Sequence, residues 1–188
     1  MAFVFYKLSE FVPEIIFQSP SNLDLFINSC IEHIPEHHLI SNLLIQALKN
    51  LFVNSQRRLN CPHLLNPYFQ TIFSKLVETM YREDIHQANV LQTVSDAIND
   101  ITDCCDSAAL NPVLKEYLLA ILQELANSID NNVFQLRLTS EQRENFQNFL
   151  GSLCQILLFK LKEVVDEGFT VSILQLVQSL FNFNQKVI

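Results

Sequence analysis

The chain contains 188 residues, of which 49% are apolar and only two are glycine, and its formal net charge is −8. A chain of this length can bury one sizeable core, and so few glycines leave little for sheet turns or phosphate-binding loops. The composition therefore predicts an all-α protein. The negative charge argues against binding of nucleic acid, which requires clustered Lys and Arg side chains, and favours a basic partner.

The sequence lacks the signals of a membrane or secreted protein. No uninterrupted apolar run reaches the ~20 residues that span a bilayer, and the first residues, MAFVFYKLSE, carry no basic segment before their short apolar run. We therefore expect a soluble, unsecreted protein with no membrane insertion.

The five cysteines are odd in number and lack the spacing of a disulfide framework, which fits a reducing compartment. We expect buried thiols, with one member of the pair Cys104 and Cys105 packed and the other solvated. Cys61 and His63 have no CxxC or HExxH context, so we expect neither a metal nor any other cofactor.

The first part of the chain carries three amphipathic stretches separated by prolines. Residues 2–12 place apolar side chains on one helical face, and a proline ends this stretch. A second stripe starts after Asn22 and ends at Pro35, and a third runs from His38 to about Asn54. The apolar positions of the second stripe are Leu23, Phe26, Ile27, Cys30, Ile31 and Ile34, and those of the third are Leu39, Leu43, Leu44, Ala47, Leu48 and Leu51.

The strongest pattern lies between Asn66 and Cys105, where a short polar turn separates two amphipathic stretches. Asn66 is a suitable N-cap, and Pro67 is a suitable first helical residue. The pattern predicts a hairpin of two antiparallel helices. The apolar positions of the first helix are Phe69, Ile72, Phe73, Leu76, Val77 and Met80, and those of the second are Val90, Leu91, Val94, Ala97, Ile98 and Ile101.

An acidic face accompanies the second helix of this hairpin. Asp96, Asp100 and Asp103 follow one another at spacings of four and three, which places them on one side of a helix. Glu83 and Asp84 lie in the preceding turn. These five side chains are the candidate binding site for a basic segment. On spacing alone, an ordinary solvated outer face explains the acids better than a binding site does.

The predicted helix starts recur at a nearly constant interval. Asn22, Asn66 and Asn111 are separated by 44 and 45 residues, a spacing that belongs to HEAT-type repeats. We therefore predict an alpha-alpha superhelix, or solenoid, of about four helix pairs that forms a single domain. Its predicted parts are a half unit at 1–18, repeats at about 19–61, 62–106 and 107–164, and a final helix at 168–185.

Both ends of the predicted solenoid carry apolar side chains that no further repeat covers. These are Phe3 and Phe11 at one end and Phe169 and Phe181 at the other. Because terminal repeats normally present a polar outer side, the chain is expected to be a piece of a longer solenoid, or to have its ends covered by another subunit or by self-association. For the isolated chain we expect self-association or poor solubility.

The stretch LVETMYREDIHQAN, which crosses the central turn, resembles the corresponding segment of the importin beta family. Acidic residues in that family's next helix correspond to Asp96 and Asp100. The segments TSEQRENFQNFLGSLCQIL, Val171–Phe183, KLSEFVPE and the Ser41–Asn42 step are also similar, in the same order, to the middle of that family's solenoid. The matching residues at the turn are Leu76, Glu78, Thr79, Arg82, Asp84, His86, Gln87 and Asn89.

The resemblance implies a nuclear transport receptor-like module that recognises a basic import signal or adaptor on an acidic inner helical face. It implies that the five acidic side chains of the candidate site bind this segment, and it favours that role over a solvated face. The implied partners are a basic import-signal protein or an importin alpha-like adaptor, with Ran GTPase and nucleoporins as further partners. The implied locations are the cytoplasm, the nucleus and the nuclear envelope. The family's signal-clamping tryptophans are replaced at the nearest positions by Phe3 and by Ile45 or Gln46, as in a short or diverged paralogue or a fragment.

Two other classes of function compete with this one. An enzyme is not expected, because the sequence contains no Gly-rich phosphate loop, metal-ligand motif or nucleophile motif, and His86 lies in a turn without a catalytic partner. The alternative is an architectural helical-repeat scaffold that docks to a partner protein without transport activity. Only the transport-receptor function predicts salt-sensitive capture of a basic import-signal helix.

Overall fold

The computed structural model describes residues 1–82 and 90–105, together with single positions at 112, 113, 116, 117, 120, 139, 148 and 151. Contacts divide the chain into two units, Met1–Ala109 and Leu110–Ile188. The helices below belong to the first unit. No strand occurs among the described residues, so the all-α prediction is confirmed for this part of the chain.

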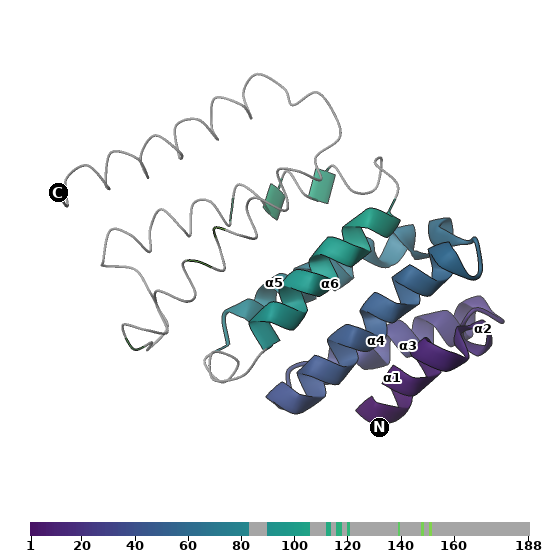
Figure 1. The fold of residues 1–188 in the computed structure, drawn as a ribbon, viewed down its shortest axis with the longest axis horizontal. Helices are drawn as coiled ribbons and strands as arrows, with labels where there is room; N and C mark the ends of the chain where they lie inside the picture. The colour runs from purple at the N-terminus through teal and green to yellow at the C-terminus, as the bar shows by residue number, and fades with distance from the viewer. Residues whose placement is uncertain are drawn as a thin grey trace, which may run out of the picture. The chain divides into compact units, whose positions relative to one another are not determined.

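The first unit consists of short and medium-length helices (Figure 1). Helices α1 and α2 are separated by a single residue, and a 3-10 helix, η1, leads directly into α5. In chain order the elements are α1 Ala2–Phe11, α2 Pro13–Ile16, α3 Pro20–His33, α4 His38–Arg57, η1 Pro62–Tyr68, α5 Phe69–Met80 and α6 Val90–Cys104.

Helix α3 begins earlier than the sequence predicts. Its N-cap is Ser19, whose hydroxyl accepts a hydrogen bond from the backbone N–H of Asn22 at 3.2 Å. Pro20 follows at the first helical position, where its fixed φ and missing N–H carry no penalty. The predicted start at Asn22 is therefore wrong, because Ser19, three positions before Asn22, caps the helix.

The predicted start of a helix at Asn66 is also wrong. Asn66 and Pro67 lie inside η1, and α5 begins only at Phe69. Pro62 opens η1 instead, and Pro67 disfavours the α conformation at the residue that precedes it. The 44-residue interval from Asn22 to Asn66 thus does not join two observed helix starts.

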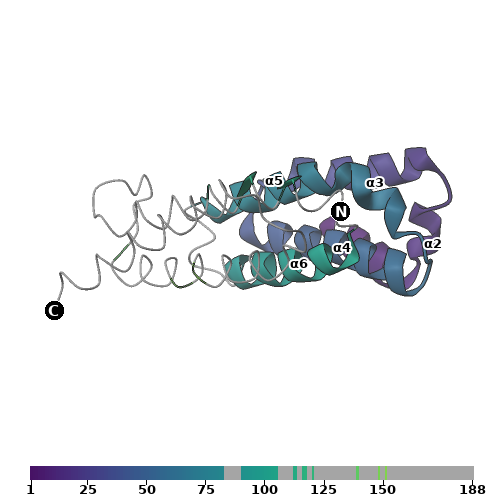
Figure 2. The same ribbon diagram turned by 90° about the horizontal axis from the view of Figure 1, so that it is seen from above.

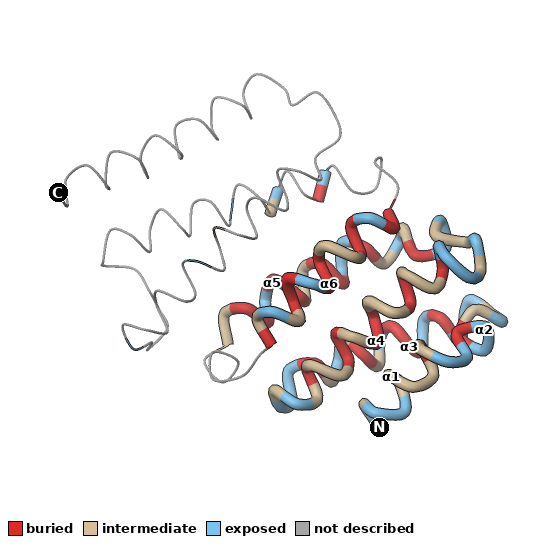
Figure 3. The backbone as a smooth tube through the Cα atoms, in the orientation of Figure 1, coloured by how far each residue is buried: buried red, intermediate tan, exposed pale blue. Residues whose placement is uncertain are grey.

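The predicted apolar stripes match the buried faces of the helices most closely in the central hairpin (Figure 3). Every predicted apolar position of α5 is buried, and five of the six in α6 are buried, with Leu91 intermediate. In α4, Leu44, Ala47, Leu48 and Leu51 are buried as predicted. The prediction that Leu39 is buried is wrong, because this residue lies in the first turn of α4 and is 62% exposed.

The helices form two layers. Helix α4 packs between α1 and α6, so these three helices lie side by side (Figure 1). Helix α3 packs on α4, and α5 packs on α6. Figure 2 shows α3 and α5 in one layer and α4 and α6 in the other. The first unit thus stacks successive helix pairs, with the second helix of each pair in the same layer.

Polar contacts tie each pair to the next. The Asn54 side chain donates a hydrogen bond to the Ser9 carbonyl at 2.8 Å, and these residues are 45 positions apart. Arg58 bonds to Glu14, and the Tyr68 hydroxyl bonds to Asp24, both at a separation of 44 positions. Corresponding places in neighbouring pairs are therefore about one predicted repeat apart. The division into repeats at 19–61, 62–106 and 107–164 stays a prediction.

Candidate protein-binding surface

The three aspartates of the predicted site share the outer side of α6. Val94, Ile98 and Ile101 bury the opposite side of this helix, and 3.6 residues per turn then place Asp96, Asp100 and Asp103 away from the core. Asp96 and Asp103 are exposed and Asp100 is intermediate. The structure therefore brings these three residues together. Glu83 and Asp84, the other two residues of the predicted site, lie outside the described residues.

Neighbouring amides bond to two of the carboxylates. The Gln92 side-chain amide donates to Asp96 at 2.7 Å, and that of Asn99 donates to Asp100 at 3.4 Å. Both amides are donors from the same helix and carry no charge. The amides thus add no charge to this polar, partly solvated surface, where carboxylates can attract a cation.

A lysine from the neighbouring helix also reaches this surface. Lys49 of α4 places its Nζ 3.7 Å from Asp100 Oδ2, with 28% of the lysine side chain and 41% of the aspartate side chain exposed. This ion pair joins α4 to α6. Sequence reasoning missed it, although Lys49 precedes Asp100 by 51 positions, close to the predicted repeat interval.

Arg82 has a structural role that the sequence did not reveal. Its guanidinium donates to the Ile34 carbonyl at 2.9 Å and to the Ser41 hydroxyl at 3.1 Å. Ser41 in turn donates to the Ile34 carbonyl. A cation thus lies at the C-terminal end of α3, where the helix dipole favours positive charge. Arg82 fastens the end of α5 to the preceding helix pair.

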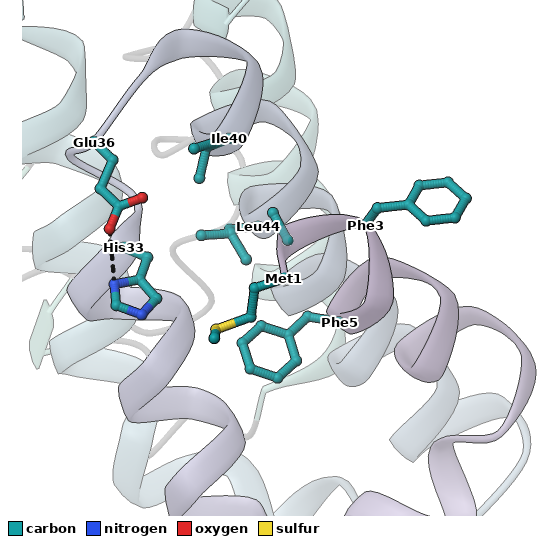
Figure 4. A pocket seen from close by; sticks show the side chains of 8 residues that line it. Met1, Phe3, Phe5, His33, Glu36, Ile40 and Leu44 are labelled. Atoms are coloured by element: carbon teal, nitrogen blue, oxygen red, sulfur yellow. Dashed lines mark ion pairs between the residues drawn. The ribbon is translucent and has the colours of Figure 1, made fainter.

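A small apolar pocket of about 270 Å³ lies among the N-terminal end of α1, the C-terminal end of α3 and the start of α4 (Figure 4). An ion pair between His33 Nδ1 and Glu36 Oε1, 3.2 Å long, lies beside it. The pocket is lined by Met1, Ala2, Phe3, Phe5, His33, Glu36, Ile40 and Leu44. The Phe3 ring points away from Met1 and Leu44, toward the outside of α1 (Figure 4).

The cysteines differ from the prediction at one place. Cys30 is buried, and burial raises the pKa of its thiol to about 12. Cys104 and Cys105 are both buried, at 6% and 8% exposure, so the expectation that one of them is solvated is wrong. The Cys104 thiol contacts the Gln56 side-chain oxygen at 3.2 Å, which explains how a residue at a helix end is covered. Cys154 lies outside the described residues.

Among the described residues, no group of three or more His, Cys, Asp or Glu side chains is arranged to hold a metal ion. None of the helices in this part of the chain is long and apolar enough to cross a membrane.

Comparison with known proteins gives one relative at low identity. The chain is 27% identical to importin subunit beta-1 of Arabidopsis thaliana over 100 residues. The chain is distantly related to the importin beta family. The match covers 52% of this chain and only 11% of the length of that protein. No family model matches the chain, and no solved structure matches it.

Proposed function

We propose that this chain is a HEAT-type, transport receptor-like module that binds a basic segment of another protein on an acidic inner helical face, formed by the solvent-facing sides of α4 and α6. The distant relationship to importin subunit beta-1 supports the class of function. The single observation that carries the proposal is the row formed by Asp96, Asp100 and Asp103 on the solvent-facing side of α6.

The stacking of helix pairs supports the repeat architecture. Helices α1, α4 and α6 succeed one another in one layer, and the polar contacts that link neighbouring pairs join residues 41 to 51 positions apart. A HEAT-type solenoid has this arrangement, because each repeat buries its apolar faces only against its neighbours.

The acidic row supports binding of a cation. Carboxylates at spacings of four and three lie roughly 5 to 6 Å apart on a helix and repel one another slightly. Lys49 relieves this repulsion at Asp100, while the Gln92 amide that bonds to Asp96 carries no charge. A segment rich in Lys and Arg would extend the same neutralisation along α6, with a strength that falls as salt rises.

The proposed partner is a basic import-signal protein or an importin alpha-like adaptor, bound without catalysis. Ran GTPase and nucleoporins are further proposed partners, and the proposed locations are the cytoplasm, the nucleus and the nuclear envelope. Because the match covers 11% of the relative, the proposal for this chain is confined to binding.

The test is titration of a fluorescein-labelled Lys/Arg-rich peptide into the full chain at two salt concentrations. Changing Asp96, Asp100 and Asp103 together to Asn is expected to lower the affinity about tenfold or more, since three exposed pairs contribute about 0.2 to 1 kcal/mol each. Circular dichroism is expected to show unchanged helix content.

A matched control removes three negative charges from other parts of the surface. Glu32, Glu36 and Glu78 are exposed residues that lie outside α4 and α6, and their change to Gln is expected to alter the affinity much less. Equal losses in both triple variants would mean that net charge alone attracts the peptide. Salt-insensitive binding, or no effect of the aspartate changes, would favour the alternative function of an architectural scaffold.

A further inference from the structure

Helix α1 exposes a line of large side chains that is unusual for a solvated surface. Phe3, Val4 and Phe11 are 59%, 55% and 60% exposed, and Lys7 lies between the two phenylalanines. Positions 3, 7 and 11 are four residues apart, so they follow one another along a single side of the helix. We call Phe3, Val4, Lys7 and Phe11 the α1 edge face.

This face lies on the side of α1 that is turned away from α4. Ser9 is buried, and its carbonyl accepts the hydrogen bond from Asn54 of α4. With 3.6 residues per turn, Lys7 is about 160° around the helix from Ser9. Helix α4 contacts one helix on each of its two sides, α1 and α6. The α1 edge face thus continues the layer at the point where a further helix would pack.

Aromatic rings hold a positive charge at the centre of this face. The Lys7 ammonium lies 5.7, 4.9 and 4.8 Å from the ring centres of Phe3, Tyr6 and Phe11. It also pairs with Glu10 at 2.9 Å, with 40% of the lysine side chain still exposed. Since an ammonium has three donors and an exposed pair is weak, a carboxylate from a partner can bond to Lys7 as well.

We propose that the α1 edge face binds an amphipathic helix of another protein, with a Glu or Asp that meets Lys7 and apolar residues four positions before and after it. A helix is the fitting partner because side chains three and four residues apart form the ridges by which helices interlock. The acidic residue follows from the charge of Lys7, and the flanking apolar residues follow from Phe3 and Phe11.

A second copy of this chain fits the face less well. In an antiparallel pairing centred on position 7, Phe3 of one copy meets Phe11 of the other, but the two Lys7 side chains also meet. Such like-charge contacts are unfavourable at an interface. Self-association through this face, as the sequence suggests, is therefore less favourable than binding of an acidic helix.

The probe is a fluorescein-labelled helical peptide of about 18 residues, long enough to keep some helix in water, with the pattern Leu-x3-Glu-x3-Leu at its centre. Fluorescence anisotropy with the full chain is expected to show binding. The same peptide with Lys in place of the central Glu is expected to bind about tenfold or more weakly, because its ammonium meets Lys7. Equal binding of both peptides, or binding of neither, would overturn the proposal.

Variants of the exposed side chains complete the test. Phe11→Ser is expected to abolish binding, and Lys7→Glu is expected to reverse the preference in favour of the Lys-centred peptide. Leu39→Ser, at a residue that is 62% exposed on α4, is the control and is expected to change nothing. If light scattering shows a dimer that Phe11→Ser dissociates, and the peptide does not bind, then the occupant is a second copy and the proposal is wrong.

Binding of the Glu-centred peptide to the α1 edge face does not involve the acidic row on α6. The Asp96, Asp100 and Asp103 changes are expected to leave binding of the Glu-centred peptide intact, because they touch no residue of the α1 edge face. Failure of one proposal therefore leaves the other to be judged separately.

Discussion

Lys49 of α4 and Asp100 of α6 form an ion pair, with Nζ and Oδ2 3.7 Å apart, on the surface proposed to receive a basic segment. The lysine occupies a position that a basic ligand would use. We therefore expect Lys49→Met to tighten binding of the Lys/Arg-rich peptide about two- to fivefold, equivalent to about 0.4 to 1 kcal/mol for a partly exposed charge. Fluorescence anisotropy at low salt measures this change.

Lys75→Met provides the matched control, since it removes the same charge from α5, where Lys75 pairs with Glu78 at 2.9 Å. The control is expected to strengthen binding only slightly, through net charge. Weaker binding by Lys49→Met would show that the ion pair orders Asp100 for the ligand instead of competing with it.

Arg82 is expected to stabilise the stack of helix pairs. Arg82→Leu removes the donors to the Ile34 carbonyl and the Ser41 hydroxyl and should lower the free energy of unfolding by about 1 to 3 kcal/mol, as is typical for charged hydrogen bonds to partly buried groups. Arg82→Lys keeps the charge but not the planar guanidinium, so its free energy of unfolding should lie between those of the unchanged chain and Arg82→Leu. Urea unfolding followed by circular dichroism measures both. A midpoint for Arg82→Leu equal to that of the unchanged chain would contradict this role.

The buried faces of the helices could be predicted from the sequence wherever one side packs and the other meets water. In α5 the stripe from Phe69 to Met80 has the helical period throughout, and each predicted position is buried. Helix starts were less predictable, because several polar residues near a proline can act as the cap. Ser19 and Asn22 both suit this role, and the choice depends on how Pro20 places the first turn. Leu39 fits the apolar period but lies in the first turn of α4, where it remains 62% exposed.

The candidate site shows the same division between local and long-range information. The shared side of Asp96, Asp100 and Asp103 follows from their spacing within one helix. The contacts of Lys49 with Asp100 and of Arg82 with Ile34 depend on how separate helices stack. Periodicity within a single helix carries no information about that packing.

Truncating a buried side chain should lower the free energy of unfolding much more than truncating an exposed one. Phe73 is 1% exposed and its ring centre is 5.6 Å from that of Phe69. Phe73→Ala should cost about 3 to 5 kcal/mol, because it removes buried surface and leaves a cavity. Leu39→Ala should stay within about 0.5 kcal/mol. Denaturant midpoints test the pair, and similar losses in both variants would contradict the burial seen in α4 and α5.

The two thiols Cys30 and Cys61 should differ in reactivity in the native state. Cys30 is buried, whereas Cys61 is partly exposed in the loop before η1. Burial raises the pKa of both thiols, and that of Cys30 to about 12. Because the thiolate is the nucleophile, iodoacetamide at mildly alkaline pH should label Cys61 first. Peptide mapping by mass spectrometry identifies the labelled sites, and early labelling of Cys30 would show that α3 opens readily.

The raised pKa of Cys30 also predicts how stability depends on pH. The thiol has a pKa of about 12 in the folded chain and 9.0 as the reference for the unfolded chain. Above pH 9 the unfolded chain therefore loses this proton while the native chain keeps it. The contribution of the buried neutral thiol to stability is thus complete below about pH 9 and is lost as pH rises toward about 12, with a slope of up to about 1.4 kcal/mol per pH unit.

Cys30→Val isolates this contribution, because valine fills a similar volume and does not titrate. Urea unfolding of the two chains at a series of alkaline pH values is expected to show a shallower loss of stability in the variant, by about one proton per molecule. Groups other than Cys30 titrate equally in both chains, so the difference between the two slopes reports this thiol alone. Parallel slopes would mean that Cys30 ionises as easily in the native chain as in the unfolded one, which its complete burial between α3 and its neighbours contradicts.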